Sequence, residues 1–207
     1  MELMLIRHGL PVRRELSEGI ADPELAPAGL EQARHLARYL DSEPIDAIYS
    51  SPLRRAHQTA VPLAEAKGLP ITVVDDVAES DRNSSEYVPI EELKATNDPR
   101  WRAMLSGEYS FGEESLEQFQ RRVVTAVEGL IDVHPGQRIA VTCHGGVINM
   151  YLAHILGLGL KQSLFYPNYT SINRVAASRR GHRNVVTMNE TSHLRGTGLP
   201  MGLVQQG

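Results

Sequence analysis

The sequence of 207 residues has one cysteine, no long apolar run and no excess of positive charge. Cys143 has no second cysteine to pair with, which excludes an internal disulfide. No stretch approaches the roughly 18 apolar residues that a membrane-spanning helix requires. The formal net charge of -4 provides no basic field that would attract nucleic acid or anionic lipid. Because the first residues run directly into a motif rather than a secretory leader, we expect a cytoplasmic protein with no membrane or nucleic-acid partner.

Strands and helices alternate along most of the chain. We predict strands at residues 2–6, 45–49, 71–74 and 138–143, helices at residues 28–40, 53–65, 90–105, 115–133 and 147–156, and a terminal hairpin of residues 171–177 and 184–189. This order predicts an α/β fold, a three-layer α/β/α sandwich with a mainly parallel sheet and one antiparallel edge strand. We expect a single domain over residues 1–193, with a substrate-facing insertion around residues 77–112 and a poorly ordered tail at residues 194–207.

Polar motifs follow three of the predicted strands. Arg7, His8 and Gly9 follow the first strand, S-S-P-L-R at residues 50–54 follows the second, and H-G-G at residues 144–146 follows the fourth. Ligands of a parallel sheet bind beyond the carboxyl ends of its strands. The three motifs should therefore meet at one edge of the sheet.

These loops contain a nucleophile and the cations that phosphoryl transfer requires. A neutral imidazole can attack phosphorus near pH 7 without a separate base, which makes His8 the candidate nucleophile. The guanidinium groups of Arg7 and Arg54 can hold the phosphoryl oxygens through pairs of hydrogen bonds. Arg55, the next residue, is interpreted as part of a solvated helix face.

The remaining parts of the site come from later in the chain. A protonated His144 would add a donor to the bound anion, and the amides of Gly145 and Gly146 lie at a predicted helix start, where anions bind. Glu79 is the candidate proton donor for the leaving oxygen, with Asp81 as its rival.

The motifs resemble conserved blocks of a known family, the histidine phosphatase superfamily, also called the phosphoglycerate-mutase-like family. The resemblance rests on L-I-R-H-G at residues 5–9, S-S-P-L-R-R-A-H-Q-T-A at residues 50–60 and V-T-C-H-G-G-V-I at residues 141–148. Residues 25–33 and 112–123 resemble the family's first helix and its long helix. These blocks occur in the family's order and span most of residues 3–149.

The resemblance implies a fold, an activity and a set of site residues. It implies a phosphoglycerate-mutase-like sandwich and a cofactor-independent phosphomonoester hydrolase for a small phosphorylated metabolite, with no metal. The phosphoryl group would be carried on His8, held by Arg7, Arg54 and His144, and Glu79 would act as acid and then as base.

Two other functions remain open. A phosphoglycerate-type mutase would return the phosphoryl group to a second hydroxyl, but the Glu-Arg-His-Tyr-Gly run of that branch is absent, which favours a hydrolase. A protein of another class would bind phosphate or a phosphopeptide without turnover. The identity of the substrate is not predicted. Arg82, Asn83, Tyr87 and Trp101 are candidates for the pocket lining, and a monomer and a homodimer are equally compatible with the sequence.

Two alternative site chemistries are less favoured. Cys143 adjoins His144, but a cysteine phosphatase needs an arginine about six residues after its thiol, where this chain has Asn149. His8, His144 and Glu79 do not follow the spacing of a familiar metal site, so we predict no metal.

Overall fold

A mixed sheet forms the centre of the computed structural model, which describes residues 1–106, 114–160 and 163–203. Within these residues the sheet has the strand order β4 (Ile71–Val73), β3 (Ala47–Ser50), β6 (Arg138–Cys143), β1 (Glu2–Arg7), β7 (Ile172–Ala177) and β8 (Arg183–Glu190). The first four strands in this order are parallel, whereas the pairings of β7 with β1 and with β8 are antiparallel. The predicted α/β sandwich with a mainly parallel sheet is confirmed.

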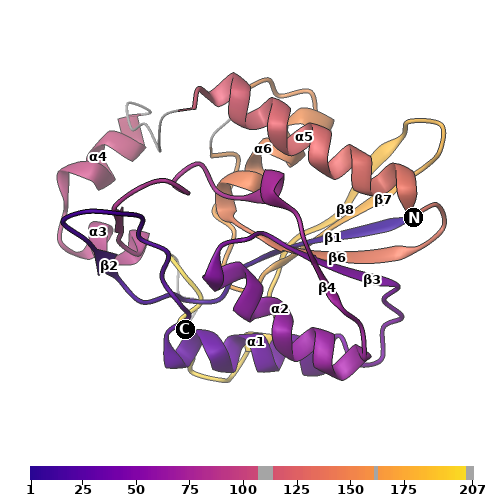
Figure 1. Cartoon of the computed structure of the whole chain (residues 1–207), viewed down its shortest axis with the longest axis horizontal. Coiled ribbons are helices and arrows are strands. Elements are labelled where there is room, and N and C mark those ends of the chain that lie inside the picture. The colour runs from indigo at the N-terminus through magenta and orange to yellow at the C-terminus, as the bar shows by residue number, and fades with distance from the viewer. Residues whose placement is uncertain (107–113, 161–162, 204–207) are drawn as a thin grey trace.

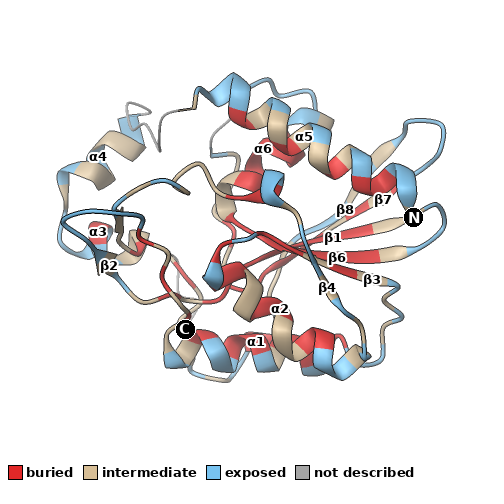
Figure 2. Ribbon diagram, viewed as in Figure 1, coloured by how far each residue is buried: buried red, intermediate tan, exposed pale blue. Residues whose placement is uncertain are grey.

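Helices cover both faces of the sheet. Helices α1 (Pro27–Tyr39) and α2 (Arg54–Lys67) pack together on one face, and α5 (Leu116–Val133) and α6 (Gly145–Ile155) pack together on the other, as Figure 1 shows. Each side has its own apolar core, and the central strands β1 and β6 are almost entirely buried (Figure 2). Since both faces are covered, β1 and β6 read as continuous apolar runs rather than as alternating strands.

The residues after β4 form a cap beyond the carboxyl ends of the parallel strands. A 3-10 turn (Asp75–Val77) leads to β5 (Glu86–Tyr87), which pairs with β2 (Arg14–Glu15) from the β1–α1 connection. Two short helices follow, α3 (Ile90–Ala95) and α4 (Pro99–Ser106) (Figure 1). The insertion expected at residues 77–112 therefore lies against the end of the sheet as far as residue 106, and its last residues lie outside the described part.

One predicted helix is divided in the structure, whereas the ends of the other helices differ from the prediction by at most two residues. The helix predicted over residues 90–105 is two helices, because the chain turns at Asn97, whose φ of 51° is left-handed, and restarts at Pro99. A proline fits the first turn of a helix but not its interior. The break lets α3 and α4 contact each other as separate elements.

The end of the chain packs against the domain. After a 3-10 turn (Ser192–Leu194), Tyr169 N–H donates to the carbonyl of Met201 at 3.0 Å, and the Gln32 side-chain amide donates to the carbonyl of Pro200. Residues 194–203, which the sequence analysis expects to belong to a poorly ordered tail, are therefore in contact with the domain through Pro200 and Met201. Residues 204–207 lie outside the described residues.

Candidate active site

The three predicted loops meet at the carboxyl edge of the sheet. Strand register places Arg7 beside Cys143, and His8 N–H donates to the carbonyl of Cys143 at 2.9 Å. In the same way Ser51 N–H donates to the carbonyl of Thr142 at 3.0 Å. The imidazole rings of His8 and His144, separated by more than 130 positions in the sequence, consequently have centroids only 5.2 Å apart.

The His8 ring is held with one nitrogen engaged by the backbone. Its Nδ1 lies 2.7 Å from the carbonyl oxygen of Gly9, which can only accept, so Nδ1 carries the proton and Nε2 keeps a lone pair. Burial, together with the positive charges of Arg55 and Arg7, holds the pKa of His8 well below its usual range. A neutral ring with a free Nε2 is the form required of a nucleophile.

Close backbone packing positions the His8 loop. A Cβ atom at Gly29 would lie 2.1 Å from the carbonyl oxygen of Leu10, and one at Gly9 would lie 2.7 Å from the carbonyl oxygen of Gly29. Both positions therefore need glycine. The loop is also tied to α2, because Gly9 N–H donates to Thr59 Oγ1 at 3.0 Å.

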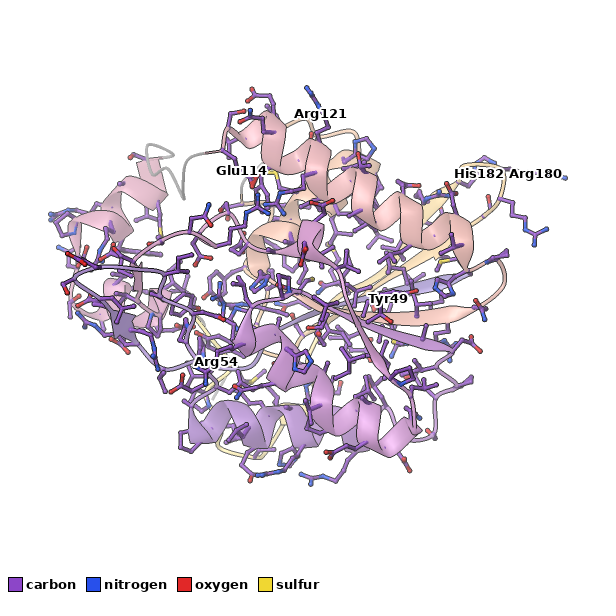
Figure 3. All side chains as sticks on the ribbon, viewed as in Figure 1. Tyr49, Arg54, Glu114, Arg121, Arg180 and His182 are labelled. Atoms are coloured by element: carbon purple, nitrogen blue, oxygen red, sulfur yellow. The ribbon has the colours of Figure 1, made fainter. Side chains whose placement is uncertain are left out.

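The arginine that lies beside His8 in the structure is Arg55, whereas Arg54, which the sequence predicts to hold phosphate, does not belong to the cavity lining. Arg54 lies at the amino-terminal end of α2, where its half-exposed side chain forms an ion pair with Glu24 at 3.0 Å (Figure 3). Arg55 is 1 % exposed, lines the cavity next to His8 and forms an ion pair with Asp81 at 2.9 Å. Adjacent helical residues point about 100° apart, so only one of the two arginines can face the sheet edge.

The spacing of small and apolar residues along α2 distinguishes Arg55 from Arg54. The buried positions of α2 are Arg55, Ala56, Thr59, Ala60, Leu63 and Ala64, a helical stripe spaced by three or four residues. Arg55 begins this stripe and Arg54 does not belong to it. The apolar period therefore separates the two arginines.

Arg7 is oriented by aromatic rings and by a backbone carbonyl. Its guanidinium carbon lies 4.3 Å from the ring centre of Tyr169 and 5.1 Å from that of Tyr166, and Nη1 donates to Pro167 O at 2.6 Å. Tyr87 stacks on Arg55 in the same way, at 4.6 Å. The stacking roles of these tyrosines were not predicted, because no sequence period connects them with the arginines.

His144 lies behind the cavity wall next to His8. It is fully buried, and its Nε2 lies 2.8 Å from Ser51 Oγ. Burial and the positive charge of Arg55 hold its pKa well below the usual range, so the ring is neutral without a ligand. A protonated His144, as the sequence analysis predicts, would therefore require a bound anion beside the ring.

Glu79 reaches the site from the first segment of the cap. Its Oε2 accepts Gly146 N–H at 2.8 Å and its Oε1 accepts Ser80 N–H at 3.0 Å. Burial, followed by the charge of Asp81, raises the pKa of Glu79. A raised pKa keeps the carboxyl group protonated at higher pH, as a proton donor requires. Its rival Asp81 is instead held by the Arg55 ion pair.

The two glycines after His144 have different contacts. A Cβ atom at Gly146 would lie 2.3 Å from Glu79 Oε1, so this position must be glycine for the carboxyl group to approach. Its N–H, predicted to bind phosphate, donates to Glu79 instead. Gly145 lines the cavity beside Arg7 and remains a predicted phosphate contact.

Several buried polar atoms at this edge have no partner within the described residues. They include Arg7 Nε, Arg55 Nε and His144 Nδ1, all of which come from residues surrounding His8. Buried donors without partners are rare in folded proteins, because each loses its hydrogen bonds to water. Three of them around one imidazole indicate a site for an anion.

A cavity of about 1060 Å³ extends from these residues to the cap. One end is formed by Arg7, His8, Arg55 and Glu79, and the other by cap residues. The cap side includes all four residues that the sequence suggested for the lining, namely Arg82, Asn83, Tyr87 and Trp101. The volume exceeds what a phosphate ion alone requires and leaves space for an organic group.

Other chemistries find little support. Burial raises the pKa of the Cys143 thiol, which makes it a poor nucleophile. The described residues contain no group of three or more His, Cys, Asp or Glu side chains arranged to hold a metal ion.

Within the described residues, no helix combines the length and apolar character needed to cross a bilayer.

Comparison with known proteins identifies the family of this chain. The sequence model of the histidine phosphatase superfamily (branch 1) matches residues 3–191. The chain belongs to the histidine phosphatase superfamily. As a histidine phosphatase it is an enzyme of a class that acts on phosphate monoesters.

Named relatives of this histidine phosphatase include enzymes with stated substrates. Phosphoserine phosphatase 1 of Hydrogenobacter thermophilus is 29 % identical over 201 residues, which covers 94 % of each chain. Phosphoglycerate mutase-like protein 4 of Arabidopsis thaliana is 33 % identical over 156 residues, 71 % of this chain and 67 % of the relative. A histidine-to-alanine variant of phosphoserine phosphatase from Entamoeba histolytica, solved with phosphoserine, has a TM-score of 0.72 at 26 % identity and covers 93 % of this chain and 98 % of its own.

Proposed function

We propose that this histidine phosphatase hydrolyses phosphate monoesters of small metabolites through a phosphohistidine on His8. The observation that carries the proposal is the tautomer of His8, whose Nε2 is left without a proton, next to buried donors of Arg7, Arg55 and His144 that have no partner within the described residues. The phosphoserine phosphatases among the relatives support a small phosphorylated substrate.

The first step transfers the phosphoryl group to the protein. Nε2 of His8 forms a bond to phosphorus while the bond from phosphorus to the ester oxygen breaks, and Glu79 gives its proton to the departing oxygen. Arg7 and Arg55 hold the equatorial oxygens. The Ser51 hydroxyl can donate a hydrogen bond to Nε2 of the neutral His144 ring, whose single proton is then on Nδ1 and can be donated as a hydrogen bond to a phosphoryl oxygen.

The second step releases phosphate. The Glu79 carboxylate takes a proton from a water molecule as the water oxygen bonds to phosphorus, and the bond from phosphorus to Nε2 breaks. The protein then returns to its starting state, with Glu79 protonated and Nε2 of His8 free. In this cycle Glu79 first donates a proton and later accepts one, and the two backbone amides that hold its carboxyl group support that role.

The test compares wild-type protein with two histidine variants. Wild type should release phosphate from an aryl phosphate and form an acid-labile phosphoprotein in rapid-quench samples, whereas His8→Ala should do neither. The control His182→Ala, in the exposed turn between β7 and β8 (Figure 3), should behave as wild type. Equal release by wild type and His8→Ala would overturn the proposal, and phosphate binding without release would support a non-catalytic binder.

A product assay separates hydrolysis from the mutase alternative. With a phosphoglycerate as substrate, we expect glycerate and inorganic phosphate. An isomeric phosphoglycerate formed without net release of phosphate would identify a mutase. The absence of the Glu-Arg-His-Tyr-Gly run favours the hydrolase outcome.

A further inference from the structure

The two arginines of the phosphate end are held by different kinds of partner. Arg55 forms an ion pair with the Asp81 carboxylate at 2.9 Å. Among the described residues, no carboxylate forms an ion pair with Arg7, which is held by a carbonyl oxygen and by two tyrosine rings. The orientation of Arg7 therefore depends on what fixes those two rings.

A single carboxylate from the cap contacts both tyrosines. The hydroxyl of Tyr169 donates to Glu91 Oε2 at 2.9 Å, and the hydroxyl of Tyr166 donates to Glu91 Oε1 at 3.2 Å. Glu91 belongs to the first turn of α3, whereas the tyrosines follow α6. Burial raises the pKa of Tyr166 to about 12, so its hydroxyl stays a donor at neutral pH.

Glu91 lies behind the cavity wall. Tyr166 and Arg7 belong to the cavity lining, and Glu91 does not. The chain end closes over this contact, since a Cβ atom at Gly202 would lie 3.1 Å from Tyr166 Cε1 and 3.5 Å from Glu91 Oε1. Glu91 is thus placed to act on bound substrate only through its neighbours.

The charge of Glu91 matters as well as its position. A hydrogen bond from a tyrosine hydroxyl to an anion is stronger than one to a neutral group and draws electron density onto the ring. A ring with more electron density attracts a guanidinium over its face more strongly. Both effects favour a fixed Arg7 with its charge available to a ligand.

We propose that Glu91 is a positioning residue that orients Arg7 for phosphate through Tyr166 and Tyr169. This inference rests on the proposed function, because it takes the Arg7 end of the cavity as the phosphate site. Its consequence is a coupling between the cap and the phosphate end: a substrate that displaces α3 would also change how tightly Arg7 holds the phosphoryl group.

The experiment measures inorganic phosphate binding by calorimetry and turnover of an aryl phosphate in parallel. Glu91→Gln should weaken phosphate binding about threefold and Glu91→Ala about tenfold, with kcat/KM falling by similar factors mainly through a higher KM. The matched control is Glu92→Gln, the exposed neighbour on α3 that forms an ion pair with Arg13 at 3.4 Å, and it should leave both values within twofold.

A double-mutant cycle distinguishes positioning of Arg7 from general support of the cap. In a Tyr166→Phe, Tyr169→Phe background, Glu91→Gln should cause no further loss of phosphate affinity, because the path to Arg7 is already interrupted. A purely structural role would lower Tm in both backgrounds and leave the phosphate Kd of folded protein unchanged. If Glu91→Ala fails to fold, the Glu91→Gln and tyrosine variants still decide the question.

Each outcome addresses the inference separately from the proposed function. Phosphate binding that weakens in the Glu91 variants, in a protein without turnover, would support the inference and refute hydrolysis. Unchanged phosphate affinity in Glu91→Ala, equal losses in both backgrounds, or no phosphate binding by wild type would each overturn the inference.

Discussion

The two ends of the cavity are built differently. At the phosphate end the side chains are almost completely buried, with Arg7 at 7 %, His8 at 3 % and His144 at 0 % exposure. At the cap end, α4 has no buried residue, although Trp101 and Met104 line the cavity. Under the proposed function, the sheet edge would supply a fixed site for the phosphoryl group, and the cap would contact the organic part of the substrate.

The supports of the two ends explain this difference. The phosphate end lies at the carboxyl ends of β1, β3 and β6. Each of these strands has a neighbouring strand on both sides. The cap is connected to the β1–α1 segment by a ladder of two residue pairs, Arg14 with Tyr87 and Glu15 with Glu86, and by backbone hydrogen bonds from Leu16 to Ser85 and from Ala21 to Ser84. Central strands are among the last parts of a protein to open, and short exposed ladders are among the first.

The largest expected effect is at the phosphate end and depends on the leaving group. Glu79→Gln should lower kcat/KM about 10³-fold for an alkyl phosphate and far less for an aryl phosphate, which needs little help from an acid. Steady-state rates with both esters give the measurement. Asp81→Asn is the matched comparison, and an equal dependence on the leaving group there would move the acid role to Asp81.

Glu79→Gln should also change the pH dependence of kcat/KM. For wild type, kcat/KM should rise with pH through the depressed pKa of His8, since only the neutral ring attacks. It should fall again as pH rises through the raised pKa of Glu79, since only the protonated carboxyl group donates. Glu79→Gln should lose the fall at high pH and keep the rise. Retention of the high-pH fall would assign it to another group.

The next largest effect separates the two adjacent arginines. Arg55→Ala should lower kcat/KM about 10²-fold, because it removes a buried cation from the transition state. Arg54→Ala should stay within twofold, because that side chain is half exposed and its ion pair with Glu24 is screened by water. Parallel assays of the two variants decide between them. Comparable losses would mean that Arg54 reaches the substrate in the complex.

The smallest effect is expected at the cap. Trp101→Ala should change KM by about two- to tenfold for esters with a bulky organic group, and should leave inorganic phosphate binding unchanged. A panel of phosphorylated sugars, glycerates and aryl esters, each assayed for released phosphate, provides the measurement. A loss of phosphate affinity in this variant would contradict the division of the cavity into two ends.

Much of the chemistry was readable from local sequence. The motifs at residues 5–9 and 141–148 place His8 and His144 directly after apolar runs, and such runs become buried parallel strands whose carboxyl ends meet. Glu79 was also predicted, and it lies in the lining of the same cavity as His8.

The S-S-P-L-R motif did not decide which of the two adjacent arginines lies beside His8, although the apolar stripe of α2 distinguishes them. Arg54 and Arg55 are the same residue type one position apart, and only the phase of α2 against the sheet directs Arg55 inward. That phase is set by packing of the whole helix. The apolar stripe of α2 reflects this phase, whereas the S-S-P-L-R motif does not.

Contacts between distant segments were decided by the tertiary structure alone. Tyr166 and Tyr169 are distant from Arg7 in the sequence, yet their rings stack on its guanidinium group. Glu91, in the cap, accepts hydrogen bonds from both tyrosine hydroxyls. No periodic pattern encodes such contacts, because they arise where loops of separate elements converge. The alternation of strands and helices fixed the fold class and the edge where the chemistry lies, while the partners of each charged group followed from packing in three dimensions.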